Sequence, residues 1–143
     1  MIEGMKFTRR TVLALALLAA GGALAQQAAP AAMGAREAYE AQQAGALVLV
    51  DIRTPPEWAQ TGVPKGALRI DVASADFLSK LEAARRAHPG KRIGLICRTS
   101  SRTSRAAQAL AARGWSEIVD VAGGVAGSPR GKGWLAEGLP VEP

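Results

Sequence analysis

The chain of 143 residues contains one cysteine, one histidine and few aromatic residues (4%). A single cysteine cannot form a disulfide within the chain, so we expect a fold that its hydrophobic core alone stabilises. No grouping of histidine, cysteine and carboxylate residues has the spacing of metal ligands, and we expect neither a metal nor a cofactor. The net charge is +6, but no dense basic block is interleaved with aromatics, which argues against binding to nucleic acid.

The sequence also lacks an apolar run long enough to span a bilayer. The apolar stretch 12–25 contains 14 residues, fewer than the about 20 that a membrane-spanning helix needs. We therefore favour a removable signal over an uncut membrane anchor, which is the alternative interpretation.

Residues 1–25 instead contain the three parts of a bacterial export signal. Lys6, Arg9 and Arg10 form a basic segment before the apolar stretch, and the Ala-Leu-Ala sequence at 23–25 is typical of a signal-peptidase site. We expect cleavage there, a periplasmic or secreted protein, and no stable membrane span after cleavage. The Arg9-Arg10 pair also resembles a twin-arginine signal, so this route and general secretion both stay open.

Short apolar runs alternate with helical patterns after a lead-in at 26–34, which is rich in Ala, Gln and Pro and is expected to be flexible. This alternation predicts an α/β fold, a parallel sheet flanked by helices on both faces, formed by one domain over 35–143. The expected strands cover 47–50, 67–72, 92–96 and 117–121. The expected helices cover 35–44, 75–87 and 103–113, with a helical turn after Pro55 and a last short helix near Trp134.

Cys97 comes directly after the expected strand 92–96 and before the expected helix, at the sheet edge where α/β folds bind ligands. Successive backbone N–H groups in such a loop, together with a helix N-terminus, can surround an anion. We expect Ser101 or Thr103 to cap this helix. We also expect the loop to favour the thiolate over the thiol, which would make Cys97 a nucleophile.

Four segments resemble the rhodanese-like domain family, in the order that the family has them. Residues 47–58 are similar to its first signature, 61–67 to the turn that follows, 97–102 to the active-site loop and 123–140 to the closing segment. The family turn usually carries a histidine that is absent here, and its loop commonly has a glycine where Ser100 stands. The resemblance implies a sulfurtransferase that carries sulfur as a persulfide on Cys97.

The resemblance also implies roles for the neighbouring residues. Asp51 and Arg53 would brace the site, with Glu57 as a partner of Arg53; a direct catalytic role for Asp51 and Arg53 is the alternative. The donor would be a small anion such as thiosulfate, drawn by basic residues that include Lys132, and the acceptor a thiol, cyanide or a protein. The residues expected to bind the substrate are Arg98, Thr99, Ser100, Ser101, Arg102 and Thr103.

Loop length separates sulfur transfer from phosphate chemistry in this group of proteins. The loop 97–102 has six residues counting the cysteine, as in the sulfurtransferases that it resembles. The related phosphatases and arsenate reductases have an arginine where this chain has Thr103. Sulfur transfer is therefore the expected function. A non-catalytic binding or redox-sensing module is the first alternative, and a phosphatase or arsenate reductase is the second.

Overall fold

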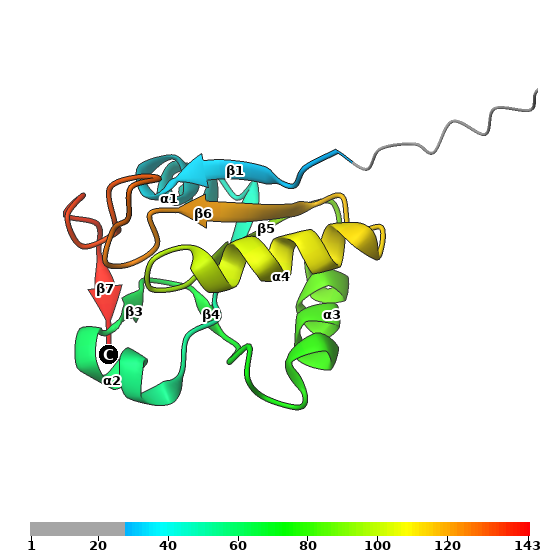
Figure 1. Cartoon of the computed structure of the whole chain (residues 1–143), viewed down its shortest axis with the longest axis horizontal. Coiled ribbons are helices and arrows are strands. Elements are labelled where there is room, and N and C mark those ends of the chain that lie inside the picture. The colour runs from blue at the N-terminus through cyan, green and yellow to red at the C-terminus, as the bar shows by residue number, and fades with distance from the viewer. Residues whose placement is uncertain (1–27) are drawn as a thin grey trace, which may run out of the picture.

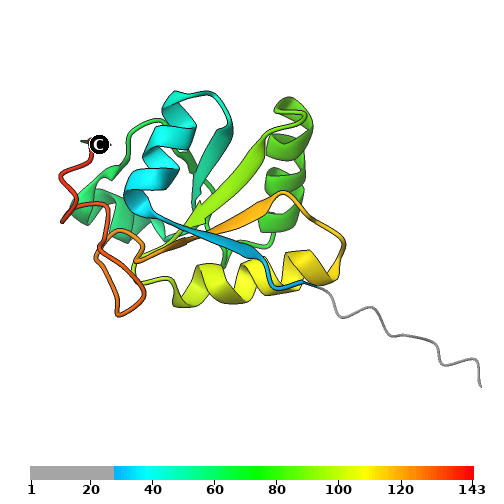
Figure 2. The ribbon, with the colours of Figure 1, turned by 90° about the horizontal axis from the view of Figure 1, so that it is seen from above.

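A computed structural model describes residues 28–143 of the chain (Figures 1 and 2). The expected export signal at 1–25 lies outside these residues. None of the helices within 28–143 combines the length and the hydropathy that crossing a bilayer requires. The helices and strands form one layered unit around a central sheet, with the chain's C-terminus beside one end of that sheet (Figure 1).

Five parallel strands form the main sheet, in the order β1-β6-β5-β2-β4. The three central strands β2, β5 and β6 are short, mostly buried apolar runs, as expected of a parallel sheet that is covered on both faces. The predicted parallel α/β sheet is therefore confirmed. The strands are β1 (Ala31–Gly34), β2 (Leu47–Asp51), β4 (Leu68–Arg69), β5 (Arg92–Ile96) and β6 (Ile118–Ala122), while β3 (Val63–Pro64) and β7 (Val141–Glu142) form a separate antiparallel pair.

The helices divide between the two faces of the sheet (Figure 2). They are α1 (Ala35–Gln43), α2 (Pro55–Thr61), α3 (Phe77–Ala87) and α4 (Ser101–Ala112). One core cluster joins α1 to the sheet through side chains such as Leu49 and Ile96, together with Trp134 of the closing segment. The other cluster joins α3 and α4 to the opposite face and includes Leu95 and Cys97. Alternation along β5 therefore places Cys97 on the face that α4 covers.

Three segments differ from the sequence-based expectation. The expected flexible lead-in is wrong for Ala31–Gly34, because these residues pair with β6 as an edge strand of the sheet. The expected strand 67–72 shortens to Leu68–Arg69, although Ile70 still donates a backbone hydrogen bond to Asp51. The expected helix near Trp134 is a run of turns, because the Trp134 N–H bonds to the distant Gly124 carbonyl rather than within a helix.

The parallel direction of the strands brings three segments to one edge of the sheet. Asp51 lies opposite Ile96 in the register of β2 and β5, and Leu95 lies opposite Asp120 in the register of β5 and β6. The loops that follow these three strands therefore meet at the carboxyl edge. Cys97 stands at the centre of this edge, directly after β5.

Candidate functional site

Cys97 lies beneath the N-terminus of α4, and its side chain has no exposed surface. The Cys97 Sγ atom is 3.5 Å from Thr103 Oγ1, close enough for a weak hydrogen bond in either direction. The structure thus brings together the cysteine and a hydroxyl from the first turn of the following helix. A reaction at this sulfur takes place inside the protein rather than at its surface.

Ser100 produces the sharp turn between the strand and the helix. Its φ of 78° lies in the left-handed region, which explains why the resembling family commonly has glycine there. The strain of about 1–2 kcal/mol for a residue with a Cβ is opposed by a hydrogen bond of 2.6 Å from the Gly123 N–H to Ser100 Oγ. Ser100 is also the N-cap position, so the expected capping by Ser101 or Thr103 is wrong.

The backbone N–H groups of residues 98–103 form no hydrogen bond to any acceptor within 28–143. The next N–H, that of Ser104, already belongs to the helical pattern and bonds to the Ser100 carbonyl. Six consecutive donors therefore remain available in the loop that follows Cys97 and at the positive end of a 12-residue helix. Such an arrangement can stabilise a negatively charged group bound there.

The segment after β6 forms backbone hydrogen bonds to the carbonyl groups of the loop. The Val125 and Ala126 N–H groups donate to the carbonyls of Cys97 and Arg98, each at 2.9 Å. Gly124 lies so close that a Cβ at this position would be 2.6 Å from both carbonyl oxygens. Gly124, at the start of the segment that resembles the family's closing segment, thus allows two backbone segments to touch.

Arg102 forms a paired contact with Glu57, which corrects the expectation that Glu57 is a partner of Arg53. The two Arg102 guanidinium nitrogens donate to the two Glu57 carboxylate oxygens at 2.8 and 2.6 Å. The Thr54 N–H also donates to Glu57, which fixes the first turn of α2. These bonds, the one from Arg102 first, lower the pKa of Glu57 from 4.5 to about 2. Arg102 therefore ties the loop to α2, and its charge is already paired.

Asp51 and Arg53 form a second ion pair below the loop, both with side chains at most 1% exposed. Arg53 donates to Asp51 Oδ2 at 2.8 Å, to Thr61 Oγ1 at 2.8 Å and to the Gly62 carbonyl at 2.8 Å. The bonds to Thr61 and Gly62 join the end of β2 to α2 and the turn after it. This geometry is that of the brace that the family resemblance implies.

Sequence reasoning missed two residues of this edge, Asp120 and Arg130. The Thr103 hydroxyl donates to Asp120 Oδ1 at 2.7 Å, and Arg130 Nη1 donates to Asp120 Oδ2 at 2.6 Å. The available signal was a carboxylate in the middle of the apolar run 118–122, since a charge in a buried strand needs a partner. Asp120 is buried beside Thr103, whose hydroxyl connects this carboxylate to the Cys97 sulfur through two hydrogen bonds.

Two pockets flank the loop. A pocket of about 140 Å³ is lined by Arg53, Glu57, Gln60, Thr61, Arg98, Val125, Ala126 and Leu135. A wider one of about 380 Å³ is lined by Thr99, Ser100, Ser101, Ser104, Arg105, Ser128, Pro129 and Arg130. Of the expected donor-attracting residues, Arg98 is exposed at the smaller pocket, whereas Lys132 lines neither. Trp134 of the closing segment is fully buried in the core and lines neither pocket.

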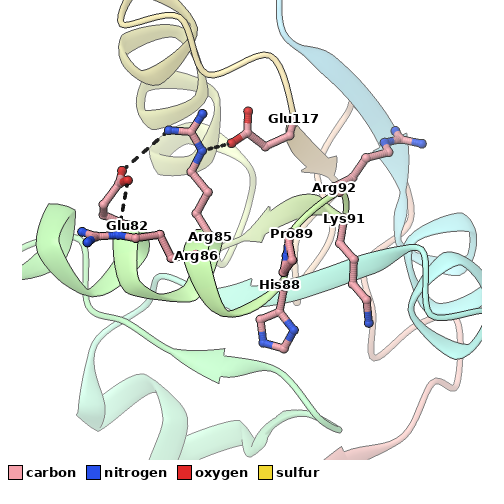
Figure 3. A pocket seen from close by; sticks show the side chains of 9 residues that line it. Glu82, Arg85, Arg86, His88, Pro89, Lys91, Arg92 and Glu117 are labelled. Atoms are coloured by element: carbon pink, nitrogen blue, oxygen red, sulfur yellow. Dashed lines mark ion pairs between the residues drawn. The ribbon is translucent and has the colours of Figure 1, made fainter.

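A third pocket of about 460 Å³ lies at the opposite, amino edge of the sheet (Figure 3). Figure 3 shows Arg85 between Glu82 and Glu117, with His88 on the loop that precedes β5. The pocket contains none of the predicted site residues, and His88 is separated from Cys97 by the length of β5. Within residues 28–143, no group of three histidine, cysteine or acidic residues is placed to hold a metal ion.

The model of the rhodanese-like domain family matches residues 34–127 of the chain. A solved structure of a protein from M. tuberculosis is 25% identical and covers 80% of this chain and 98% of its own, with a TM-score of 0.64. A rhodanese-related protein from Thermoplasma volcanium is 26% identical and covers 78% of this chain and 97% of its own, with a TM-score of 0.55. No curated protein matches the chain.

A third similar structure is that of a Rhodopseudomonas palustris protein described as a possible tyrosine phosphatase. It is 22% identical and covers 79% of this chain and 85% of its own, with a TM-score of 0.59. At this identity the similarity shows a shared fold only. It leaves open which chemistry the loop after β5 performs.

Proposed function

The chain belongs to the rhodanese-like domain family, and on this premise we propose that it is a sulfurtransferase carrying a sulfur atom as a persulfide on Cys97. One observation carries the proposal. Six consecutive backbone N–H groups, those of residues 98–103 directly after Cys97, have no protein acceptor among the described residues. They can accommodate the negative charge of a thiolate and then that of a persulfide.

The first half of the proposed reaction loads the cysteine. The Cys97 thiolate attacks the outer sulfur of a small anionic donor such as thiosulfate, and a new S–S bond forms. The S–S bond of thiosulfate breaks, and sulfite leaves with the electron pair of that bond. The persulfide anion then accepts hydrogen bonds from the N–H groups of residues 98–103, at the N-terminus of α4.

The second half of the proposed reaction removes the sulfur atom from Cys97. A nucleophilic acceptor, cyanide in an assay or a thiol or protein in the cell, attacks the outer sulfur of the persulfide. The S–S bond breaks, its electron pair stays on Cys97, and the thiolate is regenerated. This is a ping-pong sequence, because the first product leaves before the acceptor reacts.

The smaller pocket beside the loop supports a small anionic donor. Its volume is about 140 Å³, and Arg98 is an exposed cation at its wall. Arg102 contributes less attraction because Glu57 neutralises it. Since the sulfur itself is buried, we expect thiosulfate to react and a bulky aryl thiosulfonate to react slowly. The ratio of the two rates measures how strongly the loop excludes large donors.

The complete burial of Cys97 also favours a second candidate, a non-catalytic binding or redox-sensing module of the same fold. In that case the cysteine would take up no sulfur. Phosphatase and arsenate reductase chemistry has less support, because Thr103 occupies the position of the arginine that these enzymes use. A generic aryl phosphate tests phosphatase activity directly.

Intact mass spectrometry tests the proposal. Folded, reduced protein is measured before and after incubation with thiosulfate, beside Cys97→Ser and the remote variant Arg86→Gln. We expect wild type and Arg86→Gln to gain one sulfur atom, cyanide to remove it as thiocyanate, and Cys97→Ser to gain nothing. A folded, reduced protein that gains no sulfur from thiosulfate or any other sulfane donor would refute the proposed function.

We also propose that residues 1–25 direct the protein to the periplasm or out of the cell. The basic segment, the apolar stretch and the Ala-Leu-Ala sequence support this proposal. Expression of the full chain in a bacterial host, followed by mass measurement of the periplasmic fraction, tests it. A mature protein that begins at Gln26 is the expected result, and an uncut protein held in the membrane fraction would contradict it.

A further inference from the structure

A buried carboxylate lies behind the reactive loop and reaches the sulfur through one hydroxyl. Thr103 Oγ1 is 3.5 Å from Cys97 Sγ on one side and 2.7 Å from Asp120 Oδ1 on the other. Cys97 and Thr103 have no exposed surface, and Asp120 is 3% exposed. The three groups therefore interact away from bulk water, where the direction of each hydrogen bond matters most.

The hydrogen of the Thr103 hydroxyl has two competing acceptors besides the sulfur. Asp120 Oδ1 lies at 2.7 Å, and the Ser100 carbonyl lies at 3.2 Å. The shorter bond to a carboxylate is the stronger one. The hydrogen therefore points to Asp120, and the hydroxyl presents a lone pair to Cys97. A lone pair accepts a hydrogen bond from a thiol but repels a thiolate.

We infer that Asp120 is a positioning residue that acts on Cys97 through Thr103: it holds the hydroxyl as an acceptor toward the sulfur and so opposes the ionisation that makes Cys97 a nucleophile. The inference rests on the proposed function, since this control matters for catalysis only where Cys97 is the nucleophile. Ionisation breaks the S–H bond and passes the proton to water. The Thr103 hydrogen then turns from Asp120 to the sulfur, and Asp120 keeps its bond to Arg130.

Arg130 assigns a role to the segment 126–133, which the family resemblance leaves unexplained. Its guanidinium donates to Asp120 Oδ2 at 2.6 Å, while its side chain is 45% exposed at the rim of the wider pocket. The positive charge weakens the hold of Asp120 on the Thr103 hydroxyl and offsets the carboxylate's repulsion of a thiolate. Asp120 and Arg130 therefore act on the thiolate in opposite directions.

Other charged groups also face this edge of the sheet. They come from β2, α2 and the loop itself, and their own contacts remain in place in the variants proposed below. These groups are Asp51, Arg53, Glu57, Arg98 and Arg102. A change in the titration midpoint of Cys97 after substitution of Asp120 or Arg130 therefore comes from the substituted residue and not from these other charged groups.

The test follows the ultraviolet absorbance of the thiolate as the pH rises, with Cys97→Ser as the blank. The single cysteine makes the signal unambiguous. In Asp120→Asn the amide is a weaker, uncharged acceptor, so we expect the midpoint of the curve to fall by about one pH unit. The remote variant Asp76→Asn, which removes an exposed carboxylate, leaves the midpoint unchanged.

Arg130→Gln should shift the midpoint in the opposite direction. Its loss removes the offsetting positive charge, so we expect the midpoint to rise by about half a pH unit, while the remote variant Arg86→Gln has no effect. Because Arg130 is partly exposed, this variant keeps the inference testable even if Asp120→Asn unfolds. Midpoints that stay in place, or that move in the same direction in both variants, would overturn the inference.

Variants of Thr103 show whether the hydroxyl transmits the effect. In a Thr103→Val background the shift caused by Asp120→Asn should shrink to less than half, and in Thr103→Ser, which keeps the hydroxyl, it should persist. An equal shift without the hydroxyl would mean that Asp120 acts only through space, and the positioning role would be wrong.

No sulfur donor is present in these titrations, so the inference and the proposed function can fail separately. If the midpoints move as stated but no protein gains sulfur from any donor, the proposed function fails and the positioning of the thiol stands. If both hold, Asp120→Asn should load with sulfur up to about tenfold faster than wild type at a pH below both midpoints. Loading at the wild-type rate there would contradict the inference.

Discussion

The two edges of the central sheet carry similar residues in different settings. At the carboxyl edge, Arg53 and Arg102 bond to carboxylates in a buried or partly buried network around the Cys97 loop. At the amino edge, Arg86 is 75% exposed, and its nitrogen is 3.7 Å from the Glu82 carboxylate (Figure 3). Arg86 therefore faces solvent at the amino edge, whereas Arg53 at the carboxyl edge is buried with its partner.

This difference shows that burial and the number of hydrogen bonds, rather than charge itself, distinguish the ion pairs beside the Cys97 loop from the Arg86–Glu82 pair. An exposed ion pair contributes about 0–1 kcal/mol, because water competes with the partner. A buried charge that loses its partner costs about 3–5 kcal/mol. Matched substitutions at the two edges measure this contrast, and the following predictions run from the largest expected effect to the smallest.

Arg53→Met should have the largest effect on stability. The substitution leaves the Asp51 carboxylate buried without its guanidinium and removes the bonds to Thr61 and Gly62. We expect the free energy of unfolding to fall by about 3–5 kcal/mol, measured by urea denaturation. A loss below about 1 kcal/mol would show that this pair behaves like an exposed one and would remove the contrast between the edges.

A comparison of Gly124→Ala with Gly90→Ala separates the loss of stability caused by a steric clash from the loss caused by backbone strain. Both glycines have positive φ, 61° and 76°, but only at Gly124 would a Cβ meet backbone, at 2.6 Å. We expect a loss of about 2–4 kcal/mol at Gly124, where overpacking adds to strain. Gly90 lies in open space at the amino edge, so about 1 kcal/mol from strain alone is expected there. Equal losses in thermal or urea unfolding would contradict the close contact behind the loop.

Glu57→Gln should alter the dependence of stability on pH. The pKa of Glu57 is lowered from 4.5 to about 2 in the folded protein, so its contribution is full above 4.5 and is lost as the pH falls toward 2. With a discount for partial exposure, we expect wild type to lose about 1–2 kcal/mol more than Glu57→Gln over this interval. Urea unfolding at several pH values measures it, with Glu82→Gln at the amino edge as the matched control. Parallel curves for wild type and Glu57→Gln would contradict the prediction.

Arg86→Ala should have the smallest effect. Its guanidinium is exposed and only loosely paired with Glu82 at 3.7 Å. We expect a change in unfolding free energy of no more than about 0.5 kcal/mol, and no change in sulfur uptake. A larger effect would show that the amino edge is itself an organised site, and the comparison of the two edges would need revision.

Much of the fold followed from local pattern. Apolar runs of four or five residues, interrupted by Gly, Pro and polar loops, predicted β2, β5 and β6 and the parallel sheet that they form. Cys97 between β5 and α4 was located for the same reason, because the end of a buried strand and the start of a helix are both visible in the sequence. Edge strand β1 was not predicted, since Ala31–Gly34 has little local β propensity and pairs only because β6 lies beside it.

The partners of the charged side chains were decided by the assembled structure. Arg102 pairs with Glu57 across 45 positions, and Thr103 bonds to Asp120 across 17. Sequence spacing contains no signal for such pairs, because they form where parallel strands place the ends of distant segments at one edge. The position of Cys97, the loop length and the closing segment were therefore readable along the chain. The polar contacts that orient the sulfur exist only once the sheet has formed.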